Sequence, residues 1–175
     1  MLIALTGTPG TGKSTVSAIL AQRYDVVDIH SYAESKGLFE GYDEDAGSYI
    51  VDVDRLNDSV LSEHWDGTVI LDGHLSHFVD CDAIAVLRCR PSILASRLRS
   101  RGYDDRKVRE NVQAEILDVI LQESVDSGIP VYEFDTSSAA PEETADIIER
   151  TIILGESDDA SPGRTDWSGE MEEWF

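Results

Sequence analysis

The sequence predicts an α/β fold in which a five-stranded parallel sheet carries helices on both faces. Three observations predict it. Five short apolar segments alternate along the chain with segments of helical periodicity, a pattern typical of parallel sheets that are covered on both sides. The first apolar segment leads directly into a glycine-rich loop that a helical pattern follows. The length of 175 residues suits one domain of ordinary size.

The predicted strands are short runs rich in Val, Ile, Leu and Ala, bounded by residues that favour turns. The third run, for example, lies between Gly67 and Asp72, and the first ends where the glycine-rich loop begins. In chain order we expect strands at residues 2–6, 26–29, 68–71, 83–87 and 131–134.

The predicted helices show apolar residues three and four positions apart, as Val16, Ile19 and Leu20 do in the first of them. Pro91 and Pro141 stand where a helix can begin, because the first helical position needs no N–H donor. We expect helices at residues 14–23, 31–37, 53–65, 91–100, 107–124 and 141–154. The acidic residues 40–47 are expected to form a loop.

The last segment, residues 155–175, differs in composition from the rest. It carries seven acids against one arginine, and Gly, Ser, Asp and Pro dominate it until Trp167. We therefore expect a mostly extended acidic tail, pinned to the body of the protein by Trp167, Trp174 and Phe175.

The net charge is extreme, because 35 acids stand against 14 bases, which gives a formal charge of -21. Such a chain would repel the phosphate backbone, so direct binding of nucleic acid is not expected. The acid excess instead indicates adaptation to a cytoplasm rich in salt. A disordered acidic protein is the rival interpretation, which the alternating strands and helices disfavour. No apolar run approaches the ~18 residues of a membrane span, and no signal peptide follows Met1, so we expect a cytoplasmic protein.

Two cysteines, Cys81 and Cys89, are the only ones in the sequence. We interpret them as reduced and mostly buried thiols, since free cysteine is often buried. No further ligand-type residues stand near them at metal-binding spacing, so they predict no metal site.

The glycine-rich loop reads Gly7-Thr8-Pro9-Gly10-Thr11-Gly12-Lys13-Ser14 and matches the phosphate-binding pattern G-x-x-x-x-G-K-[ST]. In this pattern backbone N–H groups surround phosphate oxygens, the lysine reaches the β- and γ-phosphates, and the Ser14 hydroxyl ligates magnesium. The loop therefore predicts a P-loop enzyme that binds ATP with Mg²⁺. Alone, it does not separate a kinase from an ATPase.

A second group of candidates follows the third predicted strand. Asp72 ends that strand, at the edge of the sheet where ligands bind, and there it can hold magnesium or a water of its shell. A helix-capping role is the alternative. His74 is a candidate for orienting a water beside the γ-phosphate, and His77 a weaker one. We interpret His30 and His64 as structural.

Residues 88–109 hold 8 of the 14 bases. Arginines that close on a transferring phosphoryl group would explain such a concentration in an acidic chain. Arg101, Arg97 and Arg109 are the candidates for this role, whereas Arg90 and Arg99 are expected to form solvated ion pairs.

Taken together, four segments resemble the adenylate kinase isoenzyme 6 family, whose archaeal members are called putative adenylate kinases. The segments are the phosphate loop, Asp72-Gly73-His74, Arg97-Leu98-Arg99-Ser100-Arg101-Gly102-Tyr103 and Asn111-Val112-Gln113-Ala114-Glu115-Ile116. The resemblance runs from about residue 2 to residue 154. It implies a nucleoside-monophosphate kinase-like P-loop domain over residues 1–154, with a short lid at 100–110 and a monophosphate-binding region at 28–51.

The resemblance also implies function. It implies transfer of phosphate from ATP to a nucleoside monophosphate, with AMP the leading acceptor, ATP hydrolysis, and a role in maturing the small ribosomal subunit. By position, it assigns the ATP site to Gly10, Gly12, Lys13, Ser14, Thr15 and Arg101. The acidic stretch 40–54 is then a candidate surface for a basic small-subunit ribosomal protein.

This chain departs from ordinary adenylate kinases at two arginines that clamp the monophosphate. Their places are taken by the segment 31–36 and by His74-Leu75-Ser76-His77, which leaves Lys36 and Arg55 as substitute candidates. Two other functions therefore stay open: an ATPase-type ribosome assembly factor with negligible kinase activity, and a P-loop kinase for another small-molecule acceptor. A regulatory GTPase is disfavoured, because the sequence has no Asn-Lys-x-Asp motif.

Overall fold

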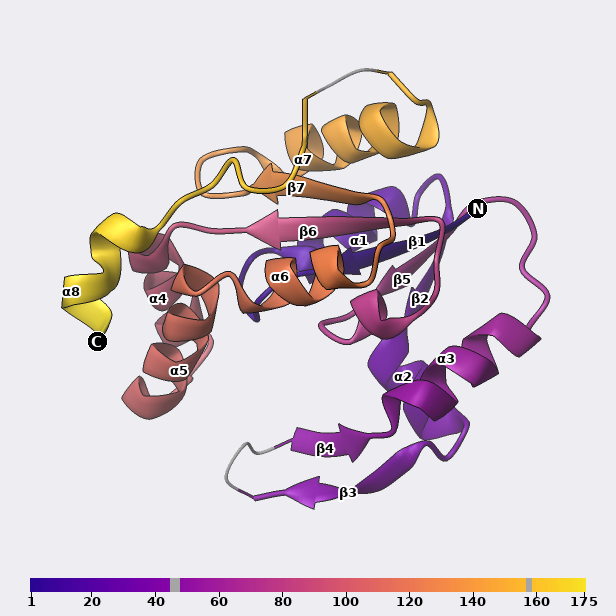
Figure 1. The fold of residues 1–175 in the computed structure, drawn as a ribbon, viewed down its shortest axis with the longest axis horizontal. Helices are drawn as coiled ribbons and strands as arrows, with labels where there is room; N and C mark the ends of the chain where they lie inside the picture. Colours follow the sequence, from indigo (N-terminus) through magenta and orange to yellow (C-terminus); the bar gives the residue numbers. More distant parts are fainter. Residues whose placement is uncertain (45–47, 157–158) are drawn as a thin grey trace.

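A computed structural model describes residues 1–44, 48–156 and 159–175. Its centre is a five-stranded parallel sheet in the order β2-β5-β1-β6-β7 (Figure 1). This confirms the predicted fold class. The strands are β1 (Leu2–Thr6), β2 (Asp25–Asp28), β5 (Val69–Asp72), β6 (Ala83–Arg88) and β7 (Val131–Asp135).

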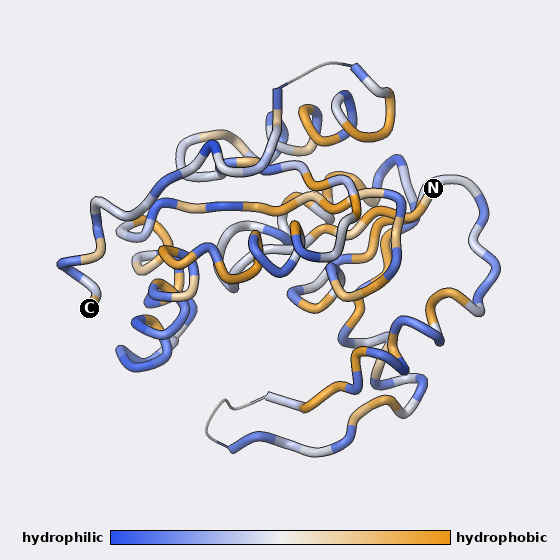
Figure 2. The backbone as a smooth tube through the Cα atoms, viewed as in Figure 1, coloured by the Kyte–Doolittle hydropathy of each residue, from blue (hydrophilic) through white to orange (hydrophobic). Residues whose placement is uncertain are grey.

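The three middle strands explain why a parallel sheet forms. Every residue of β1, β5 and β6 is buried, as expected for strands that are covered on both faces. In the register of the sheet, Ala4 of β1 lies between Leu71 of β5 and Ile84 of β6. The tube in Figure 2 shows that hydrophobic residues gather along these central strands.

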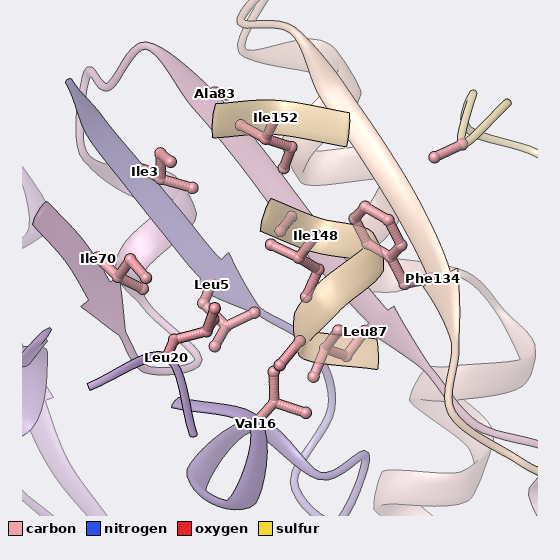
Figure 3. Close-up of a cluster of buried hydrophobic side chains, with 13 residues drawn as sticks. Ile3, Leu5, Val16, Leu20, Ile70, Ala83, Leu87, Phe134, Ile148 and Ile152 are labelled. Carbon is pink, nitrogen blue, oxygen red and sulfur yellow. The ribbon is translucent and has the colours of Figure 1, made fainter. Parts of the chain in front are cut away.

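Helices cover both faces of the sheet. They are α1 (Lys13–Leu20), α2 (Ile29–Ser35), α3 (Val53–Ser62), α4 (Pro91–Ser100), α5 (Asp105–Ile116), α6 (Val119–Asp126) and α7 (Pro141–Ile148), which a π-helical turn (Glu149–Ile153) extends. Figure 3 shows one face, where Val16 and Leu20 of α1 and Ile148 of α7 pack on Ile3 and Leu5. On the opposite face α2, α3 and α6 contribute the apolar contacts. No helix within the described ranges combines the length and the apolar character that crossing a bilayer requires.

The prediction of a loop over residues 40–47 was wrong for its described part. Phe39–Asp43 forms strand β3, which pairs antiparallel with β4 (Ser48–Val51); residues 45–47 lie outside the described residues. Aromatic cross-strand contacts stabilise this hairpin, since the Phe39 and Tyr49 rings stack at 4.5 Å and Tyr42 lies edge-on to Tyr49. The acidic residues between these aromatic positions obscured the strand pattern.

The predicted long helix 107–124 is divided in two. Helix α5 begins earlier, at Asp105, and ends at Ile116, and α6 begins at Val119. Between them Asp118 adopts a left-handed backbone conformation, with φ of 55°, which aspartate tolerates better than most residues. Its carboxylate accepts a hydrogen bond from the Arg88 guanidinium. The break therefore places a charge partner against a buried arginine.

The C-terminal segment runs along β7 and then onto α4 and α5. The Glu133 N–H donates to the Ala160 carbonyl at 2.8 Å. The segment ends in a 3-10 turn (Ser168–Glu170) and a short helix α8 (Met171–Trp174), which differ from the extended conformation that we predicted. The indoles of Trp167 and Trp174 account for the difference, because they bury against the apolar side of α4 and α5 and are only 9% and 8% exposed.

Candidate active site

The phosphate loop joins the carboxyl end of β1 to α1, at the edge of the sheet where ligands bind in this class of fold. Glycine is required at two points of close approach. At Gly7, with φ of 141°, a Cβ atom would lie 2.4 Å from the Leu87 carbonyl oxygen. At Gly10, with φ of 95°, it would lie 2.8 Å from the Leu94 side chain of α4. The loop is therefore packed tightly between β6 and α4.

Lys13 lies inside this loop. Its Nζ donates to the Gly7 carbonyl at 2.5 Å and to the Thr8 carbonyl at 3.1 Å. The pKa of Lys13 is lowered to about 8, chiefly by burial; the carboxylates of Asp72 and Glu115 oppose this shift, and Arg101 adds to it. The lysine is thus poised to lose its proton slightly above neutral pH unless an anion binds beside it.

Asp72 stands at the end of β5, beside the start of α1. Its Oδ2 accepts a hydrogen bond from the Ser17 hydroxyl at 2.6 Å, and the residue is buried. Burial raises the pKa of Asp72, whereas Ser17 and Lys13 lower it. Ser14 is exposed to the same cleft. A carboxylate and a hydroxyl are oxygen donors of the kind that Mg²⁺ takes from proteins when phosphates and waters supply its other ligands, so this pair fits the predicted metal.

A cleft of about 510 Å³ opens in front of these groups. The phosphate loop and Asp72 form its floor, α5 with its preceding turn forms one wall, and α2 with the start of β4 forms the other. Figure 1 shows α5 and the β3–β4 hairpin on the same side of the sheet. The residues that line the cleft are Pro9, Gly10, Gly12, Lys13, Ser14, Asp28, His30, Ser48, Asp72, Gly73, His74, Arg101, Tyr103, Lys107, Glu110 and Asn111.

The histidines divide between the cleft and the core. His74 lines the cleft, and loss of hydration there lowers its pKa, with Lys13 contributing in the same direction. His77 is buried: its Nδ1 lies 3.1 Å from Thr6 Oγ1 and its Nε2 lies 3.1 Å from Glu123 Oε2. These partners give His77 a structural setting, whereas the imidazole of His74 faces the cleft in its neutral form at pH 7.

His30 was interpreted as structural, yet it lines the cleft opposite α5. Its ring lies 5.2 Å from that of Phe39 and 6.2 Å from that of Tyr49. Asp28, which also lines the cleft, was not singled out from the sequence. Asp28 ends β2 and His30 follows it, so both lie at the carboxyl edge of the sheet. That position could have identified them as candidates from the sequence. His64, by contrast, lies exposed beside Asp66 at 3.3 Å.

A second cavity of about 310 Å³ adjoins the phosphate loop on the far side of Arg101. It is lined by the loop, by α4 and by the start of α7, and Thr15, Arg97, Thr136 and Pro141 are among its residues. The Arg97 Nη2 donates to the Thr136 carbonyl at 2.8 Å, which holds this arginine in place. Gly10 and Gly12 of the phosphate loop also line this cavity, so it is continuous with the loop.

The basic residues of segment 88–109 therefore do not share one role. Arg101 lines both cavities and Arg97 lines the second. Arg88 is buried, with Nε donating to Glu115 at 2.8 Å and Nη1 donating to Glu133 at 2.7 Å, so it lies in the core and lines neither cavity. Arg109 lies on the exposed surface of α5 and lines neither cavity.

The ion pairs expected of two other arginines are present. Arg90 lies 3.9 Å from Glu170, and Arg99 lies 3.4 Å from Asp105. The substitute clamps suggested for the monophosphate are elsewhere: Lys36 pairs with Glu63 at 2.5 Å, and neither Lys36 nor Arg55 is among the described residues that line the cleft.

The thiols are free and unreactive in character. Cys89 is buried and Cys81 is half-buried, and neither forms a disulfide. Burial raises the pKa of each thiol to about 11. No group of three or more His, Cys, Asp or Glu side chains within the described ranges is arranged to hold a metal ion.

Comparison with solved structures identifies the fold. A shikimate kinase from Acinetobacter baumannii in complex with shikimate superimposes with a TM-score of 0.61, covering 90% of this chain and 95% of the other, at 16% identity. A deoxyadenosine kinase from M. mycoides with bound dATP gives a TM-score of 0.53, covering 87% and 99%, at 15% identity. At this identity the likeness concerns the fold alone, which is that of the P-loop kinases.

Comparison with known sequences is more specific. A family model described as an AAA domain matches residues 3–118. A protein named "Putative adenylate kinase" from Thermococcus onnurineus is 40% identical over 174 residues, covering 98% of this chain and 94% of the relative. Proteins of the same name from Methanocaldococcus jannaschii, with 45% identity over 87% of this chain and 86% of the relative, and from Natronomonas pharaonis, with 40% over 87% and 90%, are also similar. This chain therefore belongs to the family of archaeal P-loop proteins that carry the name "Putative adenylate kinase".

Proposed function

We propose that this protein is a cytoplasmic, ATP-dependent nucleoside-monophosphate kinase with broad specificity and AMP as its leading acceptor, and that it also hydrolyses ATP. One observation carries the proposal. A phosphate loop with a half-buried lysine lies between a cavity of about 310 Å³, which we assign to the nucleoside of ATP, and a cleft of about 510 Å³, which we assign to a second phosphorylated molecule. The names of the relatives support the same reaction class.

In this proposal the donor site performs charge stabilisation. The backbone of Gly10, Gly12 and Thr15 surrounds the phosphates of ATP, and Lys13 and Arg101 offset the negative charge that develops on the transferred group. Ser14 and Asp72 would hold magnesium, which would neutralise phosphate charge. An oxygen of the acceptor phosphate forms the new bond to the γ-phosphorus as the bond to the bridging oxygen of ADP breaks.

Hydrolysis uses the same donor site with water as the acceptor. The imidazole of His74 lines the cleft beside the phosphate loop, and loss of hydration there and the charge of Lys13 lower its pKa, so its neutral form can accept a proton from water. His74 is therefore our candidate for orienting the attacking water.

The test is a coupled assay of phosphate transfer from ATP to AMP, CMP, dAMP, GMP and UMP, with ATP alone as the measure of hydrolysis. We expect transfer to AMP to exceed hydrolysis. Deoxyadenosine and shikimate belong in the same assay, because the fold also occurs in kinases for those acceptors. Transfer to one of them but to no monophosphate would replace the proposed acceptor. Hydrolysis without any transfer would favour the assembly-factor alternative.

The exposed β3–β4 hairpin favours a second function, an ATPase role in maturing the small ribosomal subunit. Tyr42, Tyr49 and Ile50 are about half exposed on it, beside the acidic stretch that we interpret as a surface for a basic small-subunit ribosomal protein. The acids of this stretch are Glu40, Asp43, Glu44, Asp45, Asp52 and Asp54, of which Asp45 lies outside the described residues. Apolar anchors are needed in such a contact, because salt screens electrostatic attraction.

This second function is tested by co-purification at high KCl. Wild type is expected to capture a basic ribosomal protein, and a variant with Asp43→Asn, Glu44→Gln and Asp45→Asn is expected to lose it. A matched control changes three exposed acids elsewhere, Asp25→Asn, Asp126→Asn and Glu142→Gln. If both variants capture the ribosomal protein equally less well than wild type, the attraction is general and not specific to the hairpin. If wild type captures no ribosomal protein, the ribosomal role is wrong.

We also infer that the acid excess adapts the protein to high salt. Self-repulsion among the charges weakens as the Debye length shortens, from about 10 Å at ~0.1 M to about 3 Å at ~1 M. The melting temperature should therefore climb steeply from low salt to multimolar KCl. A flat profile, measured by circular dichroism, would contradict this adaptation.

A further inference from the structure

We propose that Glu115, a buried residue of α5, is a positioning residue that fixes the phosphate loop to α5 and to the end of β6. The inference rests on the proposed function only in taking the phosphate loop as the ATP site. The family resemblance covers the segment around Glu115, but nothing in the sequence indicated which atoms its carboxylate would contact.

One carboxylate joins three elements. Its Oε2 accepts a hydrogen bond from the hydroxyl of Thr8, in the phosphate loop, at 2.5 Å. Its Oε1 accepts from Arg88 Nε at 2.8 Å and from the Cys89 backbone N–H at 3.0 Å, both at the end of β6. The residue is only 3% exposed. The phosphate loop, β6 and α5 therefore meet at a single anionic group.

The contact reaches the catalytic lysine through Thr8. The Thr8 carbonyl accepts from Lys13 Nζ at 3.1 Å and from both the N–H and the hydroxyl of Thr11, at 3.2 Å and 2.9 Å. A Thr8 side chain held by Glu115 thus fixes the direction of the carbonyl on which Lys13 rests. The chain of contacts runs from α5 to the loop and from the loop to the ammonium group.

A buried carboxylate is costly unless it is paired, and Arg88 supplies the pairing. The same guanidinium also binds Glu133 at 2.7 Å and the carboxylate of Asp118. Glu133 and Glu115 are therefore alike in burial and in their bond to Arg88, but only Glu115 contacts the phosphate loop. This likeness offers a matched control, because a purely structural role for Glu115 would predict that changing either glutamate lowers stability without a selective loss of ATP binding.

The test compares Thr8→Val, Glu115→Gln, the double variant and Glu133→Gln in the full chain. We measure the Kd for ATP by calorimetry, kcat and KM for transfer, and the melting temperature. Thr8→Val should weaken ATP binding about tenfold, since it removes a hydrogen bond to a charged group. Thr8→Ser, which keeps the hydroxyl, should restore most of the affinity. In the double variant the two losses should not add, because both remove the same contact.

Glu133→Gln should lower the melting temperature while leaving the Kd for ATP within about twofold of wild type. The proposal is overturned if Thr8→Val binds ATP as wild type does, or if Glu133→Gln weakens ATP binding as much as Glu115→Gln. Should Glu115→Gln fail to fold, Thr8→Val with its Thr8→Ser rescue decides the matter alone. Binding of ATP is measured without an acceptor, so failure of the kinase proposal would leave this result readable.

Discussion

The two walls of the cleft are built in different ways. On the α5 side, Gly10 of the phosphate loop packs closely on Leu94 and Thr8 donates to Glu115, while the indoles of the C-terminal segment pack on α4 and α5 behind them. On the other side, the β3–β4 hairpin is antiparallel, acidic and largely exposed, with Tyr49 50% accessible. The fold thus determines the proposed donor site closely, whereas the hairpin proposed to meet the acceptor contacts little of the core.

The largest expected effect tests the α5 side of the cleft, where the phosphate loop lies. Lys13→Ala should lower kcat by about a hundredfold to a thousandfold without unfolding the protein, because one charge-stabilising donor is lost. Lys36→Ala is the control: its lysine pairs with Glu63 outside the cleft, so activity should change little. Steady-state kinetics and circular dichroism measure both. A folded Lys13→Ala protein with normal turnover would contradict phosphoryl transfer at this loop.

The next effect separates hydrolysis from transfer. His74→Ala should lower ATP hydrolysis about a hundredfold if its imidazole orients the water, and should lower transfer to AMP far less. The His77→Ala variant serves as a comparison, since its bonds to Thr6 and Glu123 predict lost stability rather than selective loss of hydrolysis. Equal losses of both activities in His74→Ala would leave that residue a structural role.

The third effect is a pH dependence. Lys13 binds phosphate in its charged form, which predominates below its pKa of about 8 and is lost as the pH rises above it. We therefore expect kcat/KM for ATP to fall roughly tenfold per pH unit above that value, because this ratio reports the free enzyme. The corresponding fall in kcat should occur at higher pH, since the phosphate of bound ATP favours the ammonium form of Lys13. A flat kcat/KM up to about pH 10 would show that Lys13 keeps its ordinary pKa.

The smallest effect tests the other side of the cleft, at the β3–β4 hairpin. Tyr49→Ala removes the ring that stacks on Phe39 and lies near His30. We expect KM for AMP to rise about threefold to fivefold, in keeping with the energy of one aromatic contact, while KM for ATP stays unchanged. Equal increases in the KM for AMP and the KM for ATP would mean that the hairpin affects the binding of both nucleotides.

The central sheet was predictable because its strands are short, continuous apolar runs bounded by turn residues, which is typical of strands buried on both faces. The hairpin was not, because its stability comes from rings on two neighbouring strands, and acidic residues interrupt these aromatic positions along the sequence. Likewise, the break at Asp118 depends on the guanidinium of Arg88, which lies 30 positions earlier in the chain. Such pairings are set by three-dimensional contact and leave little trace in local periodicity.

The candidate site likewise has residues that the local sequence predicted and residues that only contacts between distant segments determine. The motif predicted the positions of Lys13 and Ser14, and the strand end predicted that of Asp72. The sequence assigned Arg88 no role of its own, because an arginine at the end of an apolar strand can point either to solvent or into the core, and only its buried carboxylate partners decide. His30 was missed because it follows the short edge strand β2, whose place beside β5 the sequence does not specify.

The order of the sheet has a consequence for folding. Strand β1 is central, yet its two neighbours are β5 and β6, which follow much later in the chain. Contacts between distant segments form slowly, because a long loop must close before they contribute. An apolar strand that waits for its partners is prone to aggregate. Mutual repulsion among chains of net charge -21 opposes that aggregation most at low ionic strength, where charges are screened least, so refolding at high salt exposes β1 to aggregation for the whole interval before it is enclosed.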